Sequence, residues 1–519
     1  MRVRGRGASG GLGVAALVVI GLAFAGAAWA RPGGGESYSG GGGHGDGGGG
    51  GDGGLALELV FQLLRLCFYY PKIGLPLLAI VVGVLIYSAY RKAQNKDWDS
   101  GPPVPLARAA SLEDLRRIDP EFSQVVFEDF AFRLFAAAHR ARRSEAELAA
   151  VAPYVSEAAR RALLARAPAG QAVGSVVVGA MRTIRLSLPE GADAAGADGP
   201  GPSAASPAGA AGAGQVRMVV EFEANVTTVP AAGAAAKTYF SVERWTFSRA
   251  ADARSRPPDA KGFPCPVCGA PWQAAATGTQ VCASCNTSVD NGRFDWTVED
   301  VVLASIDERP PTLTEEVRER GTELPTYYQA GFDKRWLALL DSDPELRESA
   351  VLARLRLIFD QLNAAWSKGE LREVRGLVSD GLYDSLQYWI EAYRASGLRN
   401  ELVGMRITHT VVCKLVRDRY YDALTVRLWG TGKDFVVRTA TGEVVRGSKH
   451  RDRAYSEYWT LIRAAGRKGA AHPVSTCGNC GAPLTVSMAG ACEHCGAHLT
   501  RGEFDWVLSK IEQDDSYRG

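Results

Sequence analysis

The chain has 519 residues, 46% of them hydrophobic and 22% charged, which suits about three or four domains with apolar cores. Lys and Arg number 59 and Asp and Glu number 57, so the chain has no excess of positive charge. This balance argues against a nucleic-acid-binding protein, and we predict no nucleic acid among its partners.

The N-terminus has the pattern of a secretory signal peptide over residues 1–30. A basic start precedes an apolar run from Val14 to Ala28, and Ala28-Trp29-Ala30 offers small residues for cleavage. An uncleaved first transmembrane helix is the alternative. Residues 31–54 are almost all Gly, Ser, Asp and His, and we predict a flexible linker because such a segment cannot bury a core.

Residues 55–90 form the predicted membrane segment. Ile73–Tyr90 is a run of 18 residues without charge, and we interpret it as a transmembrane helix. Leu55–Tyr70 carries Glu58 and Arg65, so it is either an interfacial helix or an extension of the span.

The residues after this span set the predicted orientation. Arg91, Lys92 and Lys96 follow Tyr90 directly, and basic residues mark the cytoplasmic side of a membrane helix. Whether the signal peptide is cleaved or retained, everything from the juxtamembrane linker at 91–118 onward is therefore expected in the cytoplasm.

Eight of the ten cysteines fall into two sets of paired CxxC motifs. Thirteen residues separate the pairs in the first set and eleven in the second. Four thiolates at such spacing surround one tetrahedral Zn²⁺ and leave no open position, so we predict two zinc ribbons with two structural Zn²⁺ ions. The predicted ligands are Cys265, Cys268, Cys282 and Cys285 in a ribbon at 263–300, and Cys477, Cys480, Cys492 and Cys495 in a ribbon at 475–511.

Disulfides are the alternative for these cysteines. They need an oxidising compartment, whereas the predicted orientation places the eight thiols in a reducing one. The two remaining cysteines, Cys67 and Cys413, are predicted to be buried and unreactive.

The ribbons belong to a repeated unit. Gly292-Arg-Phe-Asp-Trp296 follows the first ribbon and Gly502-Glu-Phe-Asp-Trp506 the second. Phe294, Phe504 and the two tryptophans either dock each ribbon onto a neighbouring domain or form the core of the ribbon itself. The apolar residues that come next are interpreted as a helix in each copy: Val298, Val301, Val302 and Ile306, and Val507, Leu508 and Ile511.

The segments before the ribbons repeat as well. Asp119-Pro-Glu and Asp343-Pro-Glu each predict a helix start, with Asp as N-cap and Pro in the first turn. More helical sequence is predicted around 145–166 and 370–396. Apolar residues at three- and four-residue steps predict the first long helix of each copy: Phe127, Ala131, Leu134, Phe135 and Ala138, then Val351, Leu355, Ile358, Phe359, Leu362 and Trp366.

Alternating sequences predict strands after these helices. Each copy ends on one strand phrase, Glu243-Arg-Trp-Thr-Phe-Ser-Arg249 or Glu457-Tyr-Trp-Thr-Leu-Ile-Arg463. Helices followed by antiparallel strands predict an α+β fold with helices on one face of a curved sheet. We place the two domains at 119–250, with a disordered insertion at 189–215, and at 343–465, and we expect a linker at 301–342. The alternating apolar residues are Val216, Met218, Val220, Phe222, Ala224 and Val226, and Leu424, Val426 and Leu428.

The second copy resembles the Tim44-like domain. The resemblance rests on Phe359-Asp-Gln-Leu-Asn-Ala-Ala-Trp366, on Leu371–Val378 with Ser379-Asp380, and on Glu457-Tyr-Trp-Thr460. The first copy is similar mainly at Asp119-Pro-Glu and Glu243-Arg-Trp-Thr246. The family implies a nuclear-transport-factor-two-like cone. We therefore expect two tandem cone-shaped helix-plus-antiparallel-sheet domains, each followed by a four-cysteine zinc ribbon, after an N-terminal membrane anchor.

The resemblance also implies a membrane-associated tether. The mitochondrial relative links a translocation channel to a chaperone motor and contacts anionic lipid. The signal peptide, glycine tract and trailing ribbon are similar to bacterial members, which implies the inner (cytoplasmic) membrane of a bacterium.

Few residues suggest catalysis. The sequence holds no HExxH, nucleophile elbow or phosphate loop. Glu243 and Glu457 are the two acids of interest, because each shares a side of its strand with a Trp two residues on. Burial in a cone would raise the pKa of such an acid, and a salt bridge to a neighbouring strand is the alternative. His139 and His409 have no acid partner evident in sequence, and we interpret both as structural.

Three functions remain open at this point. The preferred prediction is a membrane-anchored, non-enzymatic scaffold with unidentified protein partners. A lipid or small-molecule binder that uses a cone cavity is the second, and a cone-fold isomerase or lyase the third. A lipid is a further candidate partner, because the basic run Arg140, Arg142 and Arg143 either touches anionic headgroups or is a solvated helix end.

Overall fold

The computed structural model describes residues 69–72, 76, 83, 110–189, 214–230, 235–255, 263–275, 278–289, 295–308, 324–469, 476–487, 491–514, 517 and 519. The predicted signal peptide and glycine-rich linker lie outside these residues, and so does the span Ile73–Tyr90 apart from Pro76 and Gly83. Within the described ranges, no helix is both long and apolar enough to cross a membrane.

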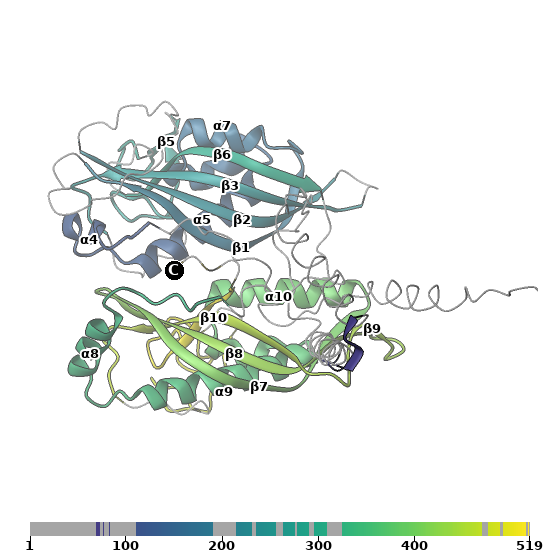
Figure 1. Ribbon diagram of the computed structural model, residues 1–519. Helices are drawn as coiled ribbons and strands as arrows, with labels where there is room; N and C mark the ends of the chain where they lie inside the picture. The colour runs from purple at the N-terminus through teal and green to yellow at the C-terminus, as the bar shows by residue number, and fades with distance from the viewer. Residues whose placement is uncertain are drawn as a thin grey trace, which may run out of the picture.

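The first domain packs helices against a four-stranded antiparallel sheet with the strand order β1-β2-β3-β6 (Figure 1). Its helices are α4 (Leu115–Ile118), α5 (Gln124–Ala141), α6 (Glu145–Leu148), the 3-10 helix η1 (Ala149–Tyr154) and α7 (Glu157–Leu164). Its strands are β1 (Ala172–Ser187), β2 (Gln215–Val229), β3 (Lys237–Ala250) and β6 (Thr297–Glu308).

The second domain repeats this arrangement with the strand order β11-β10-β8-β7 and a short β9 paired to β8. Its helices are α8 (Phe332–Ser342), α9 (Glu348–Lys368), the 3-10 helix η2 (Leu371–Leu377) and α10 (Asp380–Ala395). Its strands are β7 (Leu398–Arg417), β8 (Tyr421–Arg438), β9 (Val444–Gly447), β10 (Arg453–Ala464) and β11 (Val507–Gln513).

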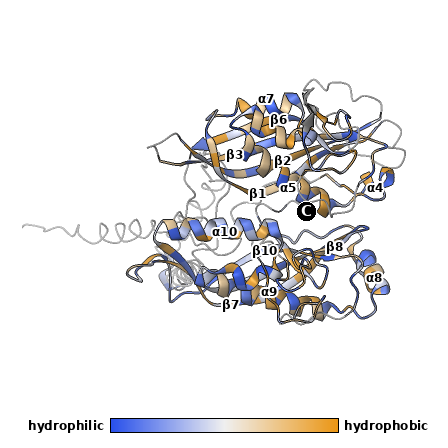
Figure 2. Cartoon of the chain, turned by 180° about the vertical axis from the view of Figure 1, so that it is seen from behind, coloured by the Kyte–Doolittle hydropathy of each residue, from blue (hydrophilic) through white to orange (hydrophobic). Residues whose placement is uncertain are grey.

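The predicted helical periodicities and the alternation of β2 are confirmed, whereas the strand with Leu424, Val426 and Leu428 is buried on both faces and not half-buried as predicted. Every apolar residue on which the two long helices were predicted is buried in α5 or α9. Figure 2 shows that α9 and α10 carry both apolar and hydrophilic residues, as helices do when one face covers a sheet. In β2 buried and half-buried residues alternate over most of the strand, so one face packs on the core. The insertion predicted at 189–215 falls between β1 and β2, which pair with each other.

The helix predicted after each ribbon is wrong, because both segments are strands. β6 pairs with β3 and β11 pairs with β10, each antiparallel. A register shift interrupts each pairing, opposite Thr246/Phe247 in β3 and Thr460/Leu461 in β10. A β-bulge breaks the two-residue period of a strand, so the apolar residues fall at spacings that imitate a helix. Each ribbon is therefore inserted between the third strand of a sheet and its fourth.

The repeated Asp-Pro-Glu motif does not cap a helix as predicted. Ser123 caps α5, with its hydroxyl accepting from the Val126 N–H at 3.2 Å, and α9 begins after Arg347. Asp119 and Asp343 are instead buried residues that follow α4 and α8.

Each of these aspartates holds an arginine at the end of the third strand. Arg249 Nη2 lies 2.6 Å from Asp119 Oδ2, and Arg463 Nη1 lies 2.8 Å from Asp343 Oδ2. Both guanidinium groups also lie 4.7 Å from the ring centroid of a tryptophan, Trp296 or Trp506. In each domain this contact thus joins the Asp-Pro-Glu motif, the end of the strand before the ribbon and the tryptophan that follows the ribbon. It holds the chain in place where it returns from the ribbon.

The outer face of the second sheet is covered by the first domain. Residues 421–428 of β8 are all buried, whereas a sheet with one wet face would show alternation. Val125 and Val126 of α5 pack on an apolar cluster that includes Val416, Tyr421 and Ile462. Arg335 Nη2 also lies 2.7 Å from Glu113 Oε2 across the two domains.

Candidate functional site

The two cysteine tetrads are candidate metal centres. In each tetrad the four Sγ atoms lie within 4.8 Å of one another. Sγ–Sγ distances are 3.8 Å for Cys265–Cys285 and 3.9 Å for Cys268–Cys282, far beyond a disulfide. A tetrahedron with Zn–S bonds of about 2.3 Å has edges of about 3.8 Å, so the donor set fits a tetrathiolate ion. Each tetrad could therefore hold a metal ion.

The second tetrad has the same geometry and an additional donor. Its Sγ–Sγ distances are 3.8 Å for Cys477–Cys495 and 3.9 Å for Cys480–Cys492. The Asn479 N–H donates to Cys477 Sγ, and the Asn479 side-chain amide donates to Cys495 Sγ, both at 3.4 Å. The side-chain donor and the Ala497 N–H lower the pKa of the Cys495 thiol to about 6. Such hydrogen bonds favour the thiolate form that a metal requires.

The sequence suggested two roles for the aromatic residues after the ribbons, docking onto a neighbouring domain or forming the core of the ribbon, and both roles occur. Trp296 and Trp506 are buried in the cores of the two domains. Phe504 packs instead with the ribbon cluster that contains Cys477, Cys492 and Leu499. Phe294 lies outside the described residues.

The first ribbon also docks on the first domain. Trp272 of the ribbon donates its indole N–H to the Ala149 carbonyl at 2.8 Å. The Tyr154 hydroxyl donates to the Pro264 carbonyl at 2.8 Å.

Glu243 is buried, as expected if its side of the strand faces the interior of the cone, but its pKa is not raised. Burial alone would raise the pKa of this carboxyl, but His139, Arg166 and the Trp245 indole lower it to about 2. Its Oε2 lies 3.3 Å from His139 Nε2, 3.4 Å from Arg166 Nη2 and 2.9 Å from Trp245 Nε1. Glu243 therefore stays ionised at neutral pH in a salt bridge, but its partners lie on α5 and after α7 and not on a neighbouring strand as the alternative predicted.

The surroundings of His139 and Arg142 also differ from the sequence interpretation. His139 is fully buried and does have an acid partner in Glu243. Arg142, assigned to an exposed basic face, is 4% exposed and donates to the Arg166 carbonyl at 3.4 Å. Arg140 and Arg143 are exposed, and Arg143 pairs with Glu147. Two of the three arginines thus remain available to solvent.

The second domain repeats the bond between the strand acid and tryptophan, but it has no histidine at the helix position of His139. Glu457 is 1% exposed and accepts from the Trp459 indole N–H at 2.9 Å. Asn363 takes the helix position that corresponds to His139, and it donates to the Phe359 carbonyl at 2.9 Å. His409 is exposed on β7 beside Trp429. Cys413 is buried, as predicted, and burial raises the pKa of its thiol to about 12.

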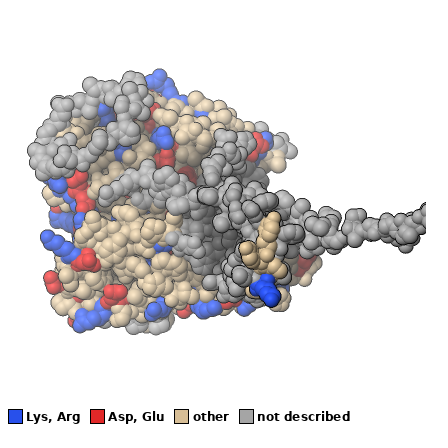
Figure 3. Space-filling model, viewed as in Figure 1, with Lys and Arg blue, Asp and Glu red and all other residues tan. Residues whose placement is uncertain are grey.

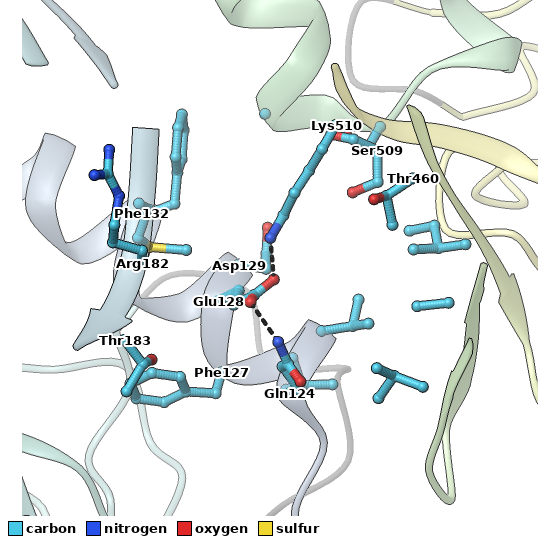
Figure 4. Close-up of a pocket in the computed structure, with 18 of the residues that line it drawn as sticks. Gln124, Phe127, Glu128, Asp129, Phe132, Arg182, Thr183, Thr460, Ser509 and Lys510 are labelled. Atoms are coloured by element: carbon cyan, nitrogen blue, oxygen red, sulfur yellow. Dashed lines mark hydrogen bonds and ion pairs between the residues drawn. The ribbon is translucent and has the colours of Figure 1, made fainter. Parts of the chain in front are cut away.

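A chamber of about 940 Å³ lies between the two domains (Figure 4). Phe127, Phe132 and Arg182 line it from the first domain, and Thr460 and Lys510 from the second. At its centre Lys510 Nζ lies 2.5 Å from Glu128 Oε2, and the Gln124 side-chain amide donates to Glu128 Oε1 at 2.8 Å. Burial alone would raise the pKa of Glu128, but Lys510 and Gln124 hold it below its usual value.

Two more charged groups of this chamber escaped prediction from sequence. Lys414 follows the buried Cys413 on β7, and Glu512 follows Ile511 on β11. Burial lowers the pKa of the Lys414 ammonium and raises the pKa of the Glu512 carboxyl. In the sequence, each of these charges lies within an apolar strand. Such a charge predicts a position on the solvent-exposed face of a sheet, and here a second domain covers that face.

Comparison with known proteins identifies the second domain. Residues 338–475 match the family model of the Tim44-like domain. Among solved structures, an Ntf2-like protein involved in plasmid conjugation matches at 8% identity over 75% of this chain and 97% of that one. Its TM-score is 0.16, and a likeness at that level supports no statement about fold or function. No curated protein matches the chain.

Proposed function

Because residues 338–475 form a Tim44-like domain, we propose that the chain is a non-enzymatic scaffold that tethers protein partners at the cytoplasmic face of a bacterial inner membrane. The match of residues 338–475 to the Tim44-like family model is the observation that carries this proposal. The duplicated architecture supports it, because two similar domains on one chain present two binding surfaces and allow avidity.

The environment of the two strand acids agrees with a role other than catalysis. Glu243 and Glu457 are each 1% exposed and hydrogen-bonded to tryptophan. Neither is among the residues that line the chamber. A general acid must reach its substrate and carry a proton near neutral pH, whereas Glu243 is ionised and enclosed.

The two metal centres have a structural role in this proposal. Zinc in each tetrad would have four protein ligands and would hold the ribbon closed. The ribbon in turn delivers β6 or β11 to the edge of a sheet, so metal binding stabilises the domain as well as the ribbon. On the described part of the face in Figure 3, charges of both signs are interspersed, which suits protein partners with mixed polar contacts.

Anchoring is proposed through the uncharged run Ile73–Tyr90, with the basic residues that follow it on the cytoplasmic side. Deleting residues 55–90 tests this directly. The full chain should remain with membranes after alkaline carbonate extraction, and the deletion variant should move to the supernatant. Equal release of both proteins would contradict anchoring by this segment.

Crosslinking in intact cells tests the tether. The tagged full chain is crosslinked, extracted from membranes and analysed by mass spectrometry, with the 55–90 deletion variant as the control. A stoichiometric protein partner that is captured only by the full chain would establish the role and name the partner. If no protein is captured above the control in repeated crosslinking with reagents of different length, the scaffold proposal fails.

A further inference from the structure

We propose that the chamber between the two domains binds a small molecule with an apolar or aromatic body and one anionic group, and that Lys414 holds the anion. The two domain cores do not form this site. It is the partly open space between the outer face of the second sheet and the α5 and β1 face of the first domain, so it exists only because the domains are paired.

The size and walls of the chamber suit such a ligand. Its volume of about 940 Å³ lies within the range of pockets that bind drug-sized molecules. The apolar part of its lining comes from both domains, with Phe127, Phe132 and Met181 on one side and Trp389 and Ile462 on the other. Figure 4 places Phe132 and Arg182 across the chamber from Thr460 and Ser509.

The charges of the chamber leave one cation without a partner. Lys510 is paired with Glu128, and Arg182 is paired with Glu221 and Glu223. Lys414 lines the same chamber, and its ammonium makes no hydrogen bond or direct ion pair within the described residues, although the Glu128 and Glu512 carboxylates attract it from farther away. Lys414 is half-buried, so its charge is only partly removed from water, and a ligand anion would recover part of the free energy that this costs.

Two carboxyls attract Lys414 without a direct ion pair, Glu128 more strongly than Glu512. Glu128 is already paired with Lys510. Burial raises the pKa of the Glu512 carboxyl, whereas the attraction of Lys510 and Lys414 lowers it, and burial has the larger effect. One unpaired cation fits one negative charge on the ligand. It does not fit a polyphosphate, which needs several cationic groups.

Photolabelling of the purified full-length chain tests the proposal. The probe is 4-benzoylbenzoate, which has an aromatic body and one carboxylate, and the comparison probe is the neutral 4-methylbenzophenone. After irradiation, labelled peptides are mapped by mass spectrometry. We expect the acid to label peptides of α5, β10 or β11 in a saturable manner. Decanoate or 2-naphthoate should compete, and the better competitor distinguishes an acyl from an aryl carboxylate.

The matched variants are Lys414→Met and Lys433→Met. Lys433 lies on β8 outside the chamber, with its Nζ 3.5 Å from Asp452. Lys414→Met should lower labelling of chamber peptides by the acid at least tenfold and leave labelling by the neutral probe unchanged, whereas Lys433→Met should change neither. Equal labelling of wild type and Lys414→Met by the acid would overturn the role of Lys414.

A second variant covers the case in which Lys414→Met does not fold. Ser509→Trp fills the chamber from β11 and should abolish labelling of chamber peptides by both probes, while zinc content and circular dichroism stay as in wild type. Unchanged labelling in this variant, or wild-type labels scattered over exposed peptides only, would overturn the chamber as a binding site.

Discussion

Arg463 in the second domain repeats the position of Arg249 in the first: each guanidinium bonds to a buried aspartate and lies 4.7 Å from the centroid of a tryptophan ring. Arg463 also lies 3.2 Å from Asp422 Oδ2. We expect Arg463→Met to lower the free energy of unfolding by about 3–5 kcal/mol, because it leaves Asp343 buried without its cation and removes one of the two arginines that pair with Asp422. Urea unfolding followed by tryptophan fluorescence measures the change.

Arg406→Met is the matched control for this variant. Arg406 is 58% exposed and lies 3.0 Å from Asp452, so its loss should cost less than about 1 kcal/mol. Equal costs for the two variants would show that the buried contact does not stabilise the fold.

Loss of one ligand should empty one metal centre. Cys492→Ser is expected to lower the zinc content of the purified chain from about two ions to about one, since three thiolates and a hydroxyl bind zinc much more weakly. Amide hydrogens of β11 should then exchange faster, because this strand enters the sheet directly from the ribbon. Cys413→Ala, which removes a buried thiol outside both tetrads, should leave the metal content unchanged. Two ions in Cys492→Ser would exclude this tetrad as a zinc site.

The ionised Glu243 should make stability depend on pH in the acid range. Its pKa falls from 4.5 to about 2 on folding, so its contribution is present above pH 4.5 and is lost as the pH falls toward 2. The difference in unfolding free energy between wild type and Glu243→Gln should be about 3 kcal/mol above pH 4.5 and should shrink below it. Acid release of metal affects both proteins equally and cancels in the difference.

Glu299→Gln provides the comparison for this pH series. Glu299 is 33% exposed and lies 3.0 Å from Arg217, so its replacement should cost less than about 1 kcal/mol at every pH. A constant difference for Glu243→Gln across the acid range would contradict the lowered pKa.

Gly502 should tolerate no side chain. Its φ is +72°, and an added Cβ would lie 2.7 Å from Cα of Arg463 and 2.9 Å from the carbonyl oxygen of Ile462. Gly502→Ala should cost about 3 kcal/mol, of which about 1 comes from the positive φ and the rest from displaced backbone. At Gly496 φ is +75° but the space is open, so Gly496→Ala should cost about 1 kcal/mol. Urea midpoints of the metal-loaded proteins compare the two.

The sequence predicted the parts of this fold that follow from a regular period. The apolar steps of α5 and α9 and the alternation of β2 reflect one face packed on one core, so spacing alone is sufficient. The helix predicted at Val298–Ile306 failed because a bulge alters the spacing within a strand.

The tertiary partners of polar residues were less accessible to sequence reasoning. His139 and Glu243 are 104 residues apart, and Glu128 and Lys510 are 382 apart, so no local pattern joins them. The cysteine tetrads were predictable because metal geometry fixes the spacing of ligands along the chain. Asp119 was assigned as a cap because its local motif fits one, and its actual partner, Arg249, is 130 residues away.

The insertion of a ribbon between the third and fourth strands has a consequence for aggregation. Without β11, the hydrogen-bonding groups of β10 that now face it would lie at an open sheet edge beside Tyr458 and Leu461. An apolar open edge is a template for strand addition by other chains. With zinc in the tetrads, zinc starvation should therefore turn each domain into a self-associating species before its core unfolds, and the metal would protect the solubility of this protein as well as its shape.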